Sequence, residues 1–483
     1  MVGRPPRRKD RRRPHARSFK VVNPATGKVL ARYSIAPPDE VRSRVAKARE
    51  AFRSWSTVDP EARGAYLVRF AELLRKGKDE FARTMSLEMG KTIREASAEV
   101  EKCAWASEYF GKNAAKFLEP EAVTTEALRS YIAFHPRGVL GSIMPWNFPM
   151  WQIIRFAVPA LAAGNTAVVK PSSLSPRSGL QIEEAFRDAG LPEGVFQIVL
   201  GDRTTAKALI RADVDMVSVT GSVGTGIDVA REAARDLKKV ILELGGSDPF
   251  IVAEDADITA AAKAAVNARF VNCGQSCIAA KRFLVVDAVA DEFRSAFVEN
   301  ARRLQVGDPL DPLTDIGPLS SRSQCDEVAA QVDDAVRKGA QVNLGGRRLR
   351  WPGYFYEPTV LSEVTRRMRV LREETFGPVA PVTSVANLEA AVREANDSPF
   401  GLGASVWTRS TSLADEIARR IEAGLVFVNG TVRSDPRMPF GGIKHSGIGR
   451  ELSRYGLLEM VNVKSVVVYS PEAGQPPQQM RAE

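Results

Sequence analysis

The chain has 483 residues, of which 44% are hydrophobic and 26% charged, and this balance is ordinary for a soluble globular protein. Its length is too great for one hydrophobic core and predicts two or three domains. No apolar run approaches the roughly 18 residues of a transmembrane helix, so we expect no membrane span. The formal net charge of +10 comes mostly from residues 1–17, which hold eight basic residues and one acidic residue.

That basic segment is rich in proline and arginine and has almost nothing to bury, so we predict a disordered tail at 1–17 and a frayed tail at 471–483. The N-terminal tail lacks the apolar region of a secretory signal. An organellar transit peptide is the alternative, although the segment has no apolar helical face. Because the charge lies in a solvated tail, it does not indicate a nucleic-acid partner.

Four cysteines form a sparse set without paired metal-ligand spacing. Such a set is typical of a reducing cytoplasm and not of a disulfide scaffold. We therefore expect a cytoplasmic protein without a metal site. The four are Cys103, Cys273, Cys277 and Cys325.

The first third of the chain reads as helical. Apolar residues recur at spacings of three and four from Val41 to Trp55, and Asp39 is the expected cap of that helix. Further helices are predicted over about 61–76 and 93–116, the latter capped by Thr92.

From about residue 130 short β-branched runs alternate with helix-like segments, which predicts βαβ units on a largely parallel sheet. These strands are expected at 131–134, 139–144, 167–170, 196–200, 216–220 and 240–243. A second α/β cycle is predicted at 249–253, 283–286, 379–385, 404–407 and 425–429. A late strand at 463–469 has no sequential partner, so it pairs either with another subunit or with residues 130–134 of its own chain.

The stretch Asn272-Cys-Gly-Gln-Ser-Cys277 places a cysteine in a glycine-bearing turn, and Glu243-Leu-Gly-Gly246 lies upstream. A thiol and a carboxylate that meet in a cleft can attack a carbonyl and then activate the water that cleaves the thioester. The alternative is that Cys277 is a small buried apolar residue, the usual fate of a free cysteine.

Two glycine- or proline-bearing turns follow predicted strands. Gly221-Ser-Val-Gly-Thr-Gly226 opens a helix whose amides could face a diphosphate, although it is not the G-x-G-x-x-G pattern and such turns often need glycine for backbone reasons alone. Asn147, between two prolines, is either an oxyanion donor or part of a tight polar turn. Histidine is nearly absent, so His445 is the one candidate base for a cysteine hydrolase.

Six motifs occur together in order: Pro145-Trp-Asn-Phe-Pro149, Gly221–Gly226, Glu243-Leu-Gly-Gly246, Gly274-Gln-Ser-Cys277, Glu374-Thr-Phe-Gly-Pro378 and Pro439-Phe-Gly-Gly442. In this combination the chain resembles the aldehyde dehydrogenase superfamily over about 18–470. The resemblance implies an α/β fold with a Rossmann-type cofactor domain (18–125 and 140–246) and an α/β catalytic domain (247–440). It also implies a small β flap (126–139 and 460–470) that pairs subunits into a homodimer or homotetramer.

The same resemblance assigns roles at the site. Cys277 would be the nucleophile and Glu243 the general base, with Asn147 and the Cys277 backbone N–H as the oxyanion hole. Glu374 and Phe376 would hold the nicotinamide ribose and ring. The remaining cofactor contacts would come from Trp146, Gly221, Ser222, Gly226 and Leu244.

Lys170 and Ser173 bear on the choice of nicotinamide. NAD-preferring relatives carry a glutamate at the position of Ser173, whereas a hydroxyl and a lysine suit a 2′-phosphate. We therefore predict NADP as the cofactor, with NAD possible.

Within the family the chain is most similar to succinate-semialdehyde dehydrogenases, which bind the distal carboxylate of the substrate with two arginines and a serine. Arg155, Arg282 and Ser434 match by spacing. The alternatives are that each arginine meets a local carboxylate and that the enzyme takes a broader range of semialdehydes or aliphatic aldehydes. An acylating enzyme using coenzyme A is disfavoured by Glu243.

Cys273 is either a reversible disulfide partner of Cys277 or a neighbour without a role.

Overall fold

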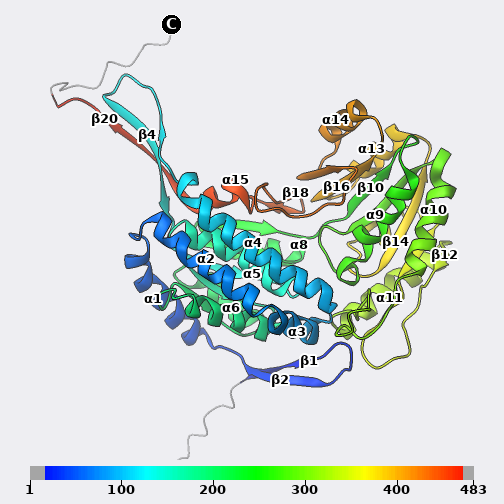
Figure 1. Ribbon diagram of the computed structural model, residues 1–483, viewed down its shortest axis with the longest axis horizontal. Helices are drawn as coiled ribbons and strands as arrows, with labels where there is room; N and C mark the ends of the chain where they lie inside the picture. The colour runs from blue at the N-terminus through cyan, green and yellow to red at the C-terminus, as the bar shows by residue number, and fades with distance from the viewer. Residues whose placement is uncertain (1–16, 472–483) are drawn as a thin grey trace, which may run out of the picture.

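The computed structural model describes residues 17–471, and Figure 1 shows two α/β bodies side by side with a thin β arm projecting from one of them. The predictions of a disordered N-terminal tail and a frayed C-terminal tail lie almost wholly outside the described residues. Among the helices within residues 17–471, none combines the length and the hydrophobicity that a membrane span requires. Within those residues, no group of three or more His, Cys, Asp or Glu side chains is placed to hold a metal ion.

The first body is built on a six-stranded sheet in the order β19-β9-β8-β5-β6-β7. Its strands are parallel except β19, which runs antiparallel to β9. They span β5 (Val139–Ile143), β6 (Thr166–Lys170), β7 (Phe196–Ile198), β8 (Met216–Thr220), β9 (Lys239–Glu243) and β19 (Gly447–Ile448).

Helices cover both faces of this sheet, and each face has its own hydrophobic core. The core on one face includes side chains of α1 (Pro38–Trp55), α7 (Arg203–Arg211) and α8 (Val223–Ala234). The larger core takes α2 (Pro60–Lys76), α3 (Lys78–Met89), α4 (Ile93–Phe117), α5 (Pro149–Ala162), α6 (Pro176–Asp188) and α15 (Ser453–Leu458). Burial on both faces explains why these strands read as continuous apolar runs.

The second body carries a seven-stranded sheet in the order β12-β13-β14-β11-β10-β16-β17, antiparallel only at β12. Its strands are β10 (Asp248–Val252), β11 (Ala280–Val286), β12 (Gln341–Leu344), β13 (Thr359–Ser362), β14 (Val379–Val385), β16 (Gly403–Trp407) and β17 (Leu425–Val428). Its helices are α9 (Ile258–Phe270), α10 (Asp287–Arg302), α11 (Arg322–Arg337), α12 (Arg369–Arg372), α13 (Leu388–Asn396) and α14 (Thr411–Arg420). The short strands β15 (Phe400–Gly401) and β18 (Ile443–Lys444) pair with each other.

The arm is a three-stranded sheet, β20-β4-β3, made of β3 (Glu121–Ala122), β4 (Arg129–Pro136) and β20 (Val461–Val468). The late strand therefore pairs within its own chain, with Val463 opposite Phe134. A separate hairpin joins β1 (Ser18–Val22) to β2 (Val29–Ser34). In Figure 1 the arm stands clear of both bodies, and exposed Val463 and Val467 lie on it.

The predicted strands agree with the structure to within a few residues at each end, and those at 216–220 and 379–385 agree fully. One helix start was wrong. The N-cap of α1 is Pro37 without a side-chain cap, and Asp39 lies in the first turn, because Pro38 already has the backbone angle of a first helical residue. The predicted cap of α4 is confirmed, since the Thr92 hydroxyl accepts the Glu95 N–H.

Candidate active site

A cavity of about 200 Å³ lies between α4, α5 and the loop that carries Cys277. Cys277, Arg155 and Ser434 all line it. Much of the remaining wall is aromatic, from Phe148, Trp151 and Phe440. The cavity thus combines a thiol with cationic and apolar surroundings in a small volume, as an enzyme pocket for a short substrate requires.

The Cys277 loop has a strained backbone. After α9 ends, the chain forms a short 3-10 turn, η1 (Val271–Gly274), in which Asn272, Cys273 and Gly274 have φ of 53°, 55° and 70°. For residues with a Cβ, this left-handed conformation costs about 1–2 kcal/mol each and persists only where neighbours hold it. Dense hydrogen bonding holds it here: the Asn272 side chain donates to the carbonyls of Asn147 at 2.7 Å and Gln275 at 3.1 Å.

Asn147 lies in the loop between β5 and α5, and its position is tied to the Cys277 loop. Its amide nitrogen lies 3.2 Å from the Gln275 carbonyl oxygen, to which it donates. One of its two amide hydrogens is therefore used within the protein, and the other is available to a ligand. The side chain is 97% buried, so a hydrogen bond that it makes to a developing oxyanion would be formed away from water.

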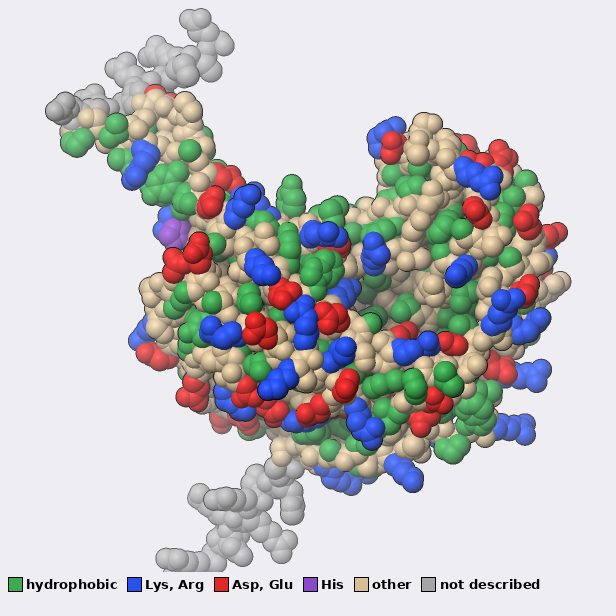
Figure 2. All heavy atoms as spheres, in the orientation of Figure 1, with side chains coloured by type: hydrophobic (Ala, Val, Ile, Leu, Met, Phe, Trp, Pro, Cys, Tyr) green, Lys and Arg blue, Asp and Glu red, His purple; other side chains and the backbone are tan. Residues whose placement is uncertain are grey.

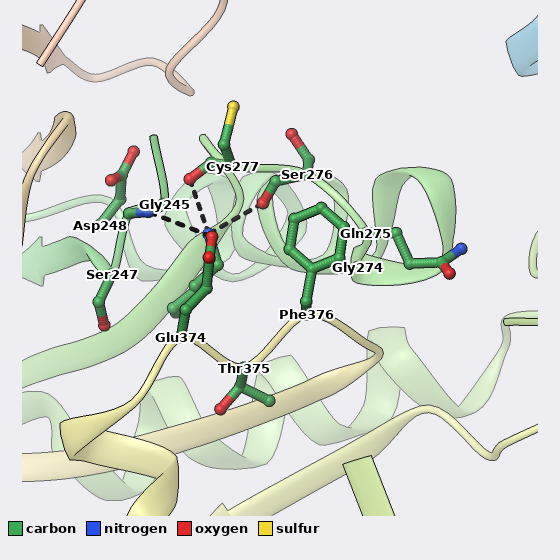
Figure 3. A network of polar contacts seen from close by, with 12 residues as sticks. Gly245, Ser247, Asp248, Gly274, Gln275, Ser276, Cys277, Glu374, Thr375 and Phe376 are labelled. Atoms are coloured by element: carbon green, nitrogen blue, oxygen red, sulfur yellow. Dashed lines mark hydrogen bonds and ion pairs between the residues drawn. The ribbon is translucent and has the colours of Figure 1, made fainter. Parts of the chain in front are cut away.

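The Cys277 thiol is half-buried beside the cavity. Burial raises the pKa of the thiol to about 11, and the nearby cations Arg155 and Lys281 counteract this rise. The Lys281 ammonium donates to the carbonyls of Ser276 at 2.9 Å and Cys277 at 2.7 Å, which fixes the backbone beneath the thiol. In Figure 3 the thiol points away from this network and from the Glu374 carboxylate.

Glu243, the last residue of β9, is 2% exposed. Neither of its carboxyl oxygens accepts a hydrogen bond from the described part of the chain. Burial and then the neighbouring Glu451 raise its pKa well above the ordinary value, while Arg155 lowers it. Because Arg155 also acts on the pKa of the Cys277 thiol, one guanidinium lies within electrostatic reach of both groups.

The loop after β9 connects Glu243 to the Cys277 backbone. Gly246 is so close to it that an added Cβ would lie 2.7 Å from the Cys277 carbonyl oxygen. The Gly246 N–H donates to Glu374 at 3.1 Å, and Lys281 lies 3.5 Å from the same carboxylate. Figure 3 shows Glu374 between the Gly245 and Cys277 segments.

Phe376 belongs to the same segment as Glu374 and meets the Trp146 ring edge-to-face at 5.7 Å. The buried Arg269 guanidinium joins this segment to the Cys277 loop, since it donates to the carbonyls of Gly274, Thr375 and Gly377. The structure thus brings the predicted ring-binding residues next to the loop that carries the thiol.

The remaining predicted cofactor residues lie at the ends of strands in the first body. Gly221 follows β8, and the Ser222 hydroxyl caps α8 by accepting the Thr225 N–H. An added Cβ at Gly226 would lie 2.5 Å from a Leu244 methyl group, so α8 packs directly on the loop after β9. Lys170 ends β6.

The sequence matches the aldehyde dehydrogenase family over residues 12–466, almost the whole chain. The chain belongs to the aldehyde dehydrogenase family.

Individual relatives agree with this assignment. The chain is 46% identical to a probable succinate-semialdehyde dehydrogenase [NADP(+)] of Synechocystis, over 92% of this chain and 98% of that protein. Among solved structures it superposes on succinic semialdehyde dehydrogenase from Streptococcus pyogenes in complex with NADP+ with a TM-score of 0.91, at 34% identity over 94% and 100% of the two chains. An NAD+ complex of aldehyde dehydrogenase from Bacillus cereus superposes with the same TM-score and identity, over 94% and 93%.

Of the three residues predicted to bind the substrate of this aldehyde dehydrogenase, Arg155 and Ser434 line the cavity, but Arg155 is already engaged. Its guanidinium forms an ion pair with fully buried Glu451 and donates to the Thr220 hydroxyl at 3.2 Å. The Phe440 ring lies 4.6 Å from it. Arg155 therefore fits the alternative interpretation, in which the arginine pairs with a carboxylate of the protein itself.

The prediction for Arg282 was wrong, because the structure does not bring it to the cavity. Its guanidinium donates, at 2.9 Å in each case, to the carbonyls of Ser247, Glu394 and Ala395. The chain has already entered β11 at Ala280, and side chains alternate across a strand, so Lys281 and Arg282 point to opposite faces. Of these two side chains, only that of Lys281 contacts the Cys277 backbone.

Sequence reasoning missed Lys102, Asn272, Lys281 and Glu451. For Lys102 a signal existed: it lies three residues after Glu99 and four before Ala106, both buried positions of α4, and is itself half-buried. For Glu451, which pairs with Arg155 from far along the chain, no local pattern could have indicated the contact.

Two other candidates lie away from the reacting groups. Cys273 is buried in the core of the second body, whereas Cys277 packs against the core of the first. His445 is exposed and does not line the cavity. Neither a Cys273–Cys277 disulfide nor a Cys277–His445 hydrolase has support from this arrangement.

Proposed function

We propose that this aldehyde dehydrogenase oxidises a short aldehyde bearing a distal carboxylate, succinate semialdehyde foremost, to the acid, with NADP as hydride acceptor. The observation that carries the proposal is a single small cavity that holds Cys277 together with Lys102, Arg155 and Ser434. The printed names of the Synechocystis and Streptococcus relatives support the same substrate and cofactor.

The residues present fit a dinucleotide with a 2′-phosphate. The turn from β8 into α8 offers the helix N-terminus and the Ser222 hydroxyl to a diphosphate. Lys170 is buried, donates to the carbonyls of Pro171 and Gly201, and keeps its third N–H for a phosphate oxygen. Burial lowers the pKa of Lys170 to about 8, and a bound phosphate would restore its charge. Ser173 adds a hydroxyl where a carboxylate would repel that phosphate.

The reaction follows from the roles of the chain's own residues. The Cys277 thiolate attacks the aldehyde carbon, and the carbonyl oxygen gains the charge that the Asn147 amide and the Cys277 N–H receive. Glu374 and Phe376 would hold the oxidised nicotinamide, which would supply the acceptor for the hydride that this carbon loses. Glu243 then takes a proton from water, whose oxygen attacks the thioester carbon, and the acid leaves as the Cys277 sulfur regains its electron pair.

The arrangement of Glu243 suits the last of these steps. Its raised pKa makes it a stronger base than an exposed glutamate, and within residues 17–471 no donor to its oxygens competes with water. Transfer to coenzyme A would not need such a base, so hydrolysis is the favoured outcome.

The test is a steady-state assay of the purified protein with succinate semialdehyde and the neutral four-carbon aldehyde butanal, each with NADP and NAD. We expect kcat/KM to be at least about tenfold higher for the anionic aldehyde, because pairing one buried charge contributes at least about 1.4 kcal/mol. Equal or higher kcat/KM for butanal would favour the alternative, a broader semialdehyde or aliphatic aldehyde dehydrogenase. A higher kcat/KM with NAD would reverse the cofactor assignment.

We also infer that the enzyme acts in the cytoplasm as a homodimer or homotetramer. The four cysteines, all within the described residues, are free thiols. The arm presents exposed apolar side chains at Val463 and Val467 on β20 and at Leu128 just before β4, as a subunit-pairing flap would. Figure 2 shows Lys and Arg side chains interspersed with Asp and Glu over the visible face, without a basic patch suited to nucleic acid. Light scattering of the purified protein would report its oligomeric state.

A further inference from the structure

Lys102 stands out among the cations near Cys277 because its charge faces the cavity. It extends from α4 and lines the same cavity as the thiol. Its ammonium nitrogen lies 2.5 Å from the Ser434 hydroxyl and 4.4 Å from the centre of the Trp151 ring. A hydroxyl and an aromatic face stabilise a cation without neutralising it, so the charge remains available to an anion.

The carboxylates around this part of the cavity already have partners. Glu99 pairs with the Lys91 ammonium and accepts the backbone N–H groups of Met150 and Trp151. Glu95 accepts the Asn272 N–H at 2.6 Å and the Thr92 hydroxyl at 3.0 Å.

Lys102 itself has no ion pair with any residue in the described range 17–471. Lys102 is half-buried on the cavity wall. Because a charge withdrawn from bulk water is normally paired, this unpaired ammonium favours a ligand that supplies the counter-charge.

The two arginines are poorer candidates for this role. Arg282 lies outside the cavity and donates to three backbone carbonyls. Arg155 lines the cavity, but buried Glu451 neutralises it. Lys102 and Ser434, by contrast, come from separate elements and meet at one point on the cavity wall, where one provides a charge and the other a hydrogen-bond donor.

We propose that Lys102, together with Ser434, binds the distal carboxylate of the aldehyde and so determines the preference for an anionic substrate. This inference rests on the proposed function and replaces the assignment of that role to Arg282. Bound there, the carboxylate would accept hydrogen bonds from the Lys102 ammonium and from the Ser434 hydroxyl, while the aldehyde carbon faces Cys277. Lys102 is a specificity-determining residue and takes no part in the bond-making steps.

The surroundings of Lys102 make this recognition sensitive to pH. The pKa of Lys102 is lowered to about 8, first by burial and then by Arg155 and Lys91, against the opposing effect of Cys103 and Glu99. A cation whose pKa is about 8 loses its charge as the pH rises through that value. The binding of an anionic aldehyde should therefore weaken above about pH 8, while the binding of a neutral one should not change through this group.

The decisive variants are Lys102→Met, which removes the charge and keeps the aliphatic stem, and Lys102→Arg, which keeps the charge. We expect Lys102→Met to raise KM for succinate semialdehyde about 10- to 100-fold. KM for butanal and kcat for both aldehydes should stay within about threefold, and Lys102→Arg should retain most of the anionic preference. Lys116→Met, an exposed position in the last turn of the same helix, is the matched control and should change neither KM.

The outcomes separate this inference from the proposed function. A wild-type enzyme without preference for succinate semialdehyde would overturn both. This inference alone would be overturned if Lys102→Met kept the wild-type preference for succinate semialdehyde, or if its kcat/KM fell by the same factor for both aldehydes.

If Lys102→Met fails to fold, the pH dependence of the wild-type enzyme decides. The ratio of kcat/KM for succinate semialdehyde to that for butanal should fall above about pH 8, and a ratio that stays flat would contradict the role of Lys102.

Discussion

The Cys277 cavity has two walls of contrasting construction. The first, the reaction wall, is the Cys277 loop with Asn147, whose strained backbone is fixed by interlocking hydrogen bonds. The second, the recognition wall, holds the Lys102 charge against the Ser434 hydroxyl and the Trp151 ring. A substitution in the reaction wall therefore disturbs a network of hydrogen bonds, whereas a substitution in the recognition wall removes one interaction.

This difference explains how one reaction can be kept while the substrate varies. In the proposed mechanism, groups of the reaction wall would contact atoms common to every aldehyde, so their loss should reduce turnover of all substrates alike. Groups of the recognition wall would contact the distal end of the aldehyde, so their loss should change KM for one class of aldehyde. A variant can therefore be assigned to one wall by whether it lowers kcat for all aldehydes or raises KM for one class of aldehyde only.

The strongest test of the reaction wall is Cys277→Ala. Without the sulfur no covalent intermediate can form, so kcat should fall by on the order of 10⁴-fold or more for every aldehyde and with either nicotinamide. Cys273→Ala, four residues away in a separate core, is the control and should retain turnover. Residual dehydrogenase activity in Cys277→Ala above about 1% would remove the assignment of the nucleophile.

Glu243→Gln should come next. The loss of the base should slow thioester hydrolysis by about 10²–10⁴-fold and leave hydride transfer intact. Rapid-mixing measurements should then show a burst of about one equivalent of reduced cofactor per subunit, followed by slow turnover. An enzyme that gives no burst would show that Glu243 acts before hydride transfer instead.

The same residue predicts a pH dependence. Burial and Glu451 raise the pKa of Glu243, and only the ionised form can accept a proton. The rate of thioester hydrolysis should therefore rise with pH through this raised pKa, at a pH above that of an ordinary glutamate. Glu243→Gln should lose that rise.

Asn147→Ala tests the oxyanion donor. Removal of one such donor typically costs about 3–4 kcal/mol of transition-state stabilisation, so kcat should fall about 10²- to 10³-fold. The fall should be the same for succinate semialdehyde and butanal, because the aldehyde oxygen is common to both. If kcat or KM changed only for succinate semialdehyde, Asn147 would instead be assigned to substrate recognition.

Much of the fold could be predicted from sequence, because buried strands such as β8 and β14 are continuous apolar runs and helices such as α2 and α4 have regular apolar spacing. The start of α1 could not be predicted from Asp39, because Pro38 competes for the helix start at the same place. For β20 the sequence left two partners open, another subunit or β4 of the same chain, since a strand's pattern does not say which edge it joins.

The site was predicted unevenly for a physical reason. Motif residues such as Cys277 and Asn147 were found because each lies in a turn whose short sequence is distinctive, and in the structure Asn147 contacts the Cys277 loop through the Gln275 carbonyl. Lys102 was missed because a helical lysine usually reaches solvent. Arg282 was misplaced because counting residues from Cys277 does not show on which face of β11 a side chain lies.

Arg282→Met tests that last distinction, since this arginine lies in neither wall. The change removes a 4% exposed guanidinium and leaves the carbonyls of Ser247, Glu394 and Ala395 without their donor. Each buried acceptor left unsatisfied costs about 1–3 kcal/mol, so thermal unfolding should begin several degrees lower. KM for succinate semialdehyde and for butanal should nevertheless change by less than about threefold, and by the same factor. A selective rise in KM for the anionic aldehyde would instead show that Arg282 reaches the substrate, and it would place the recognition wall on β11 instead of α4.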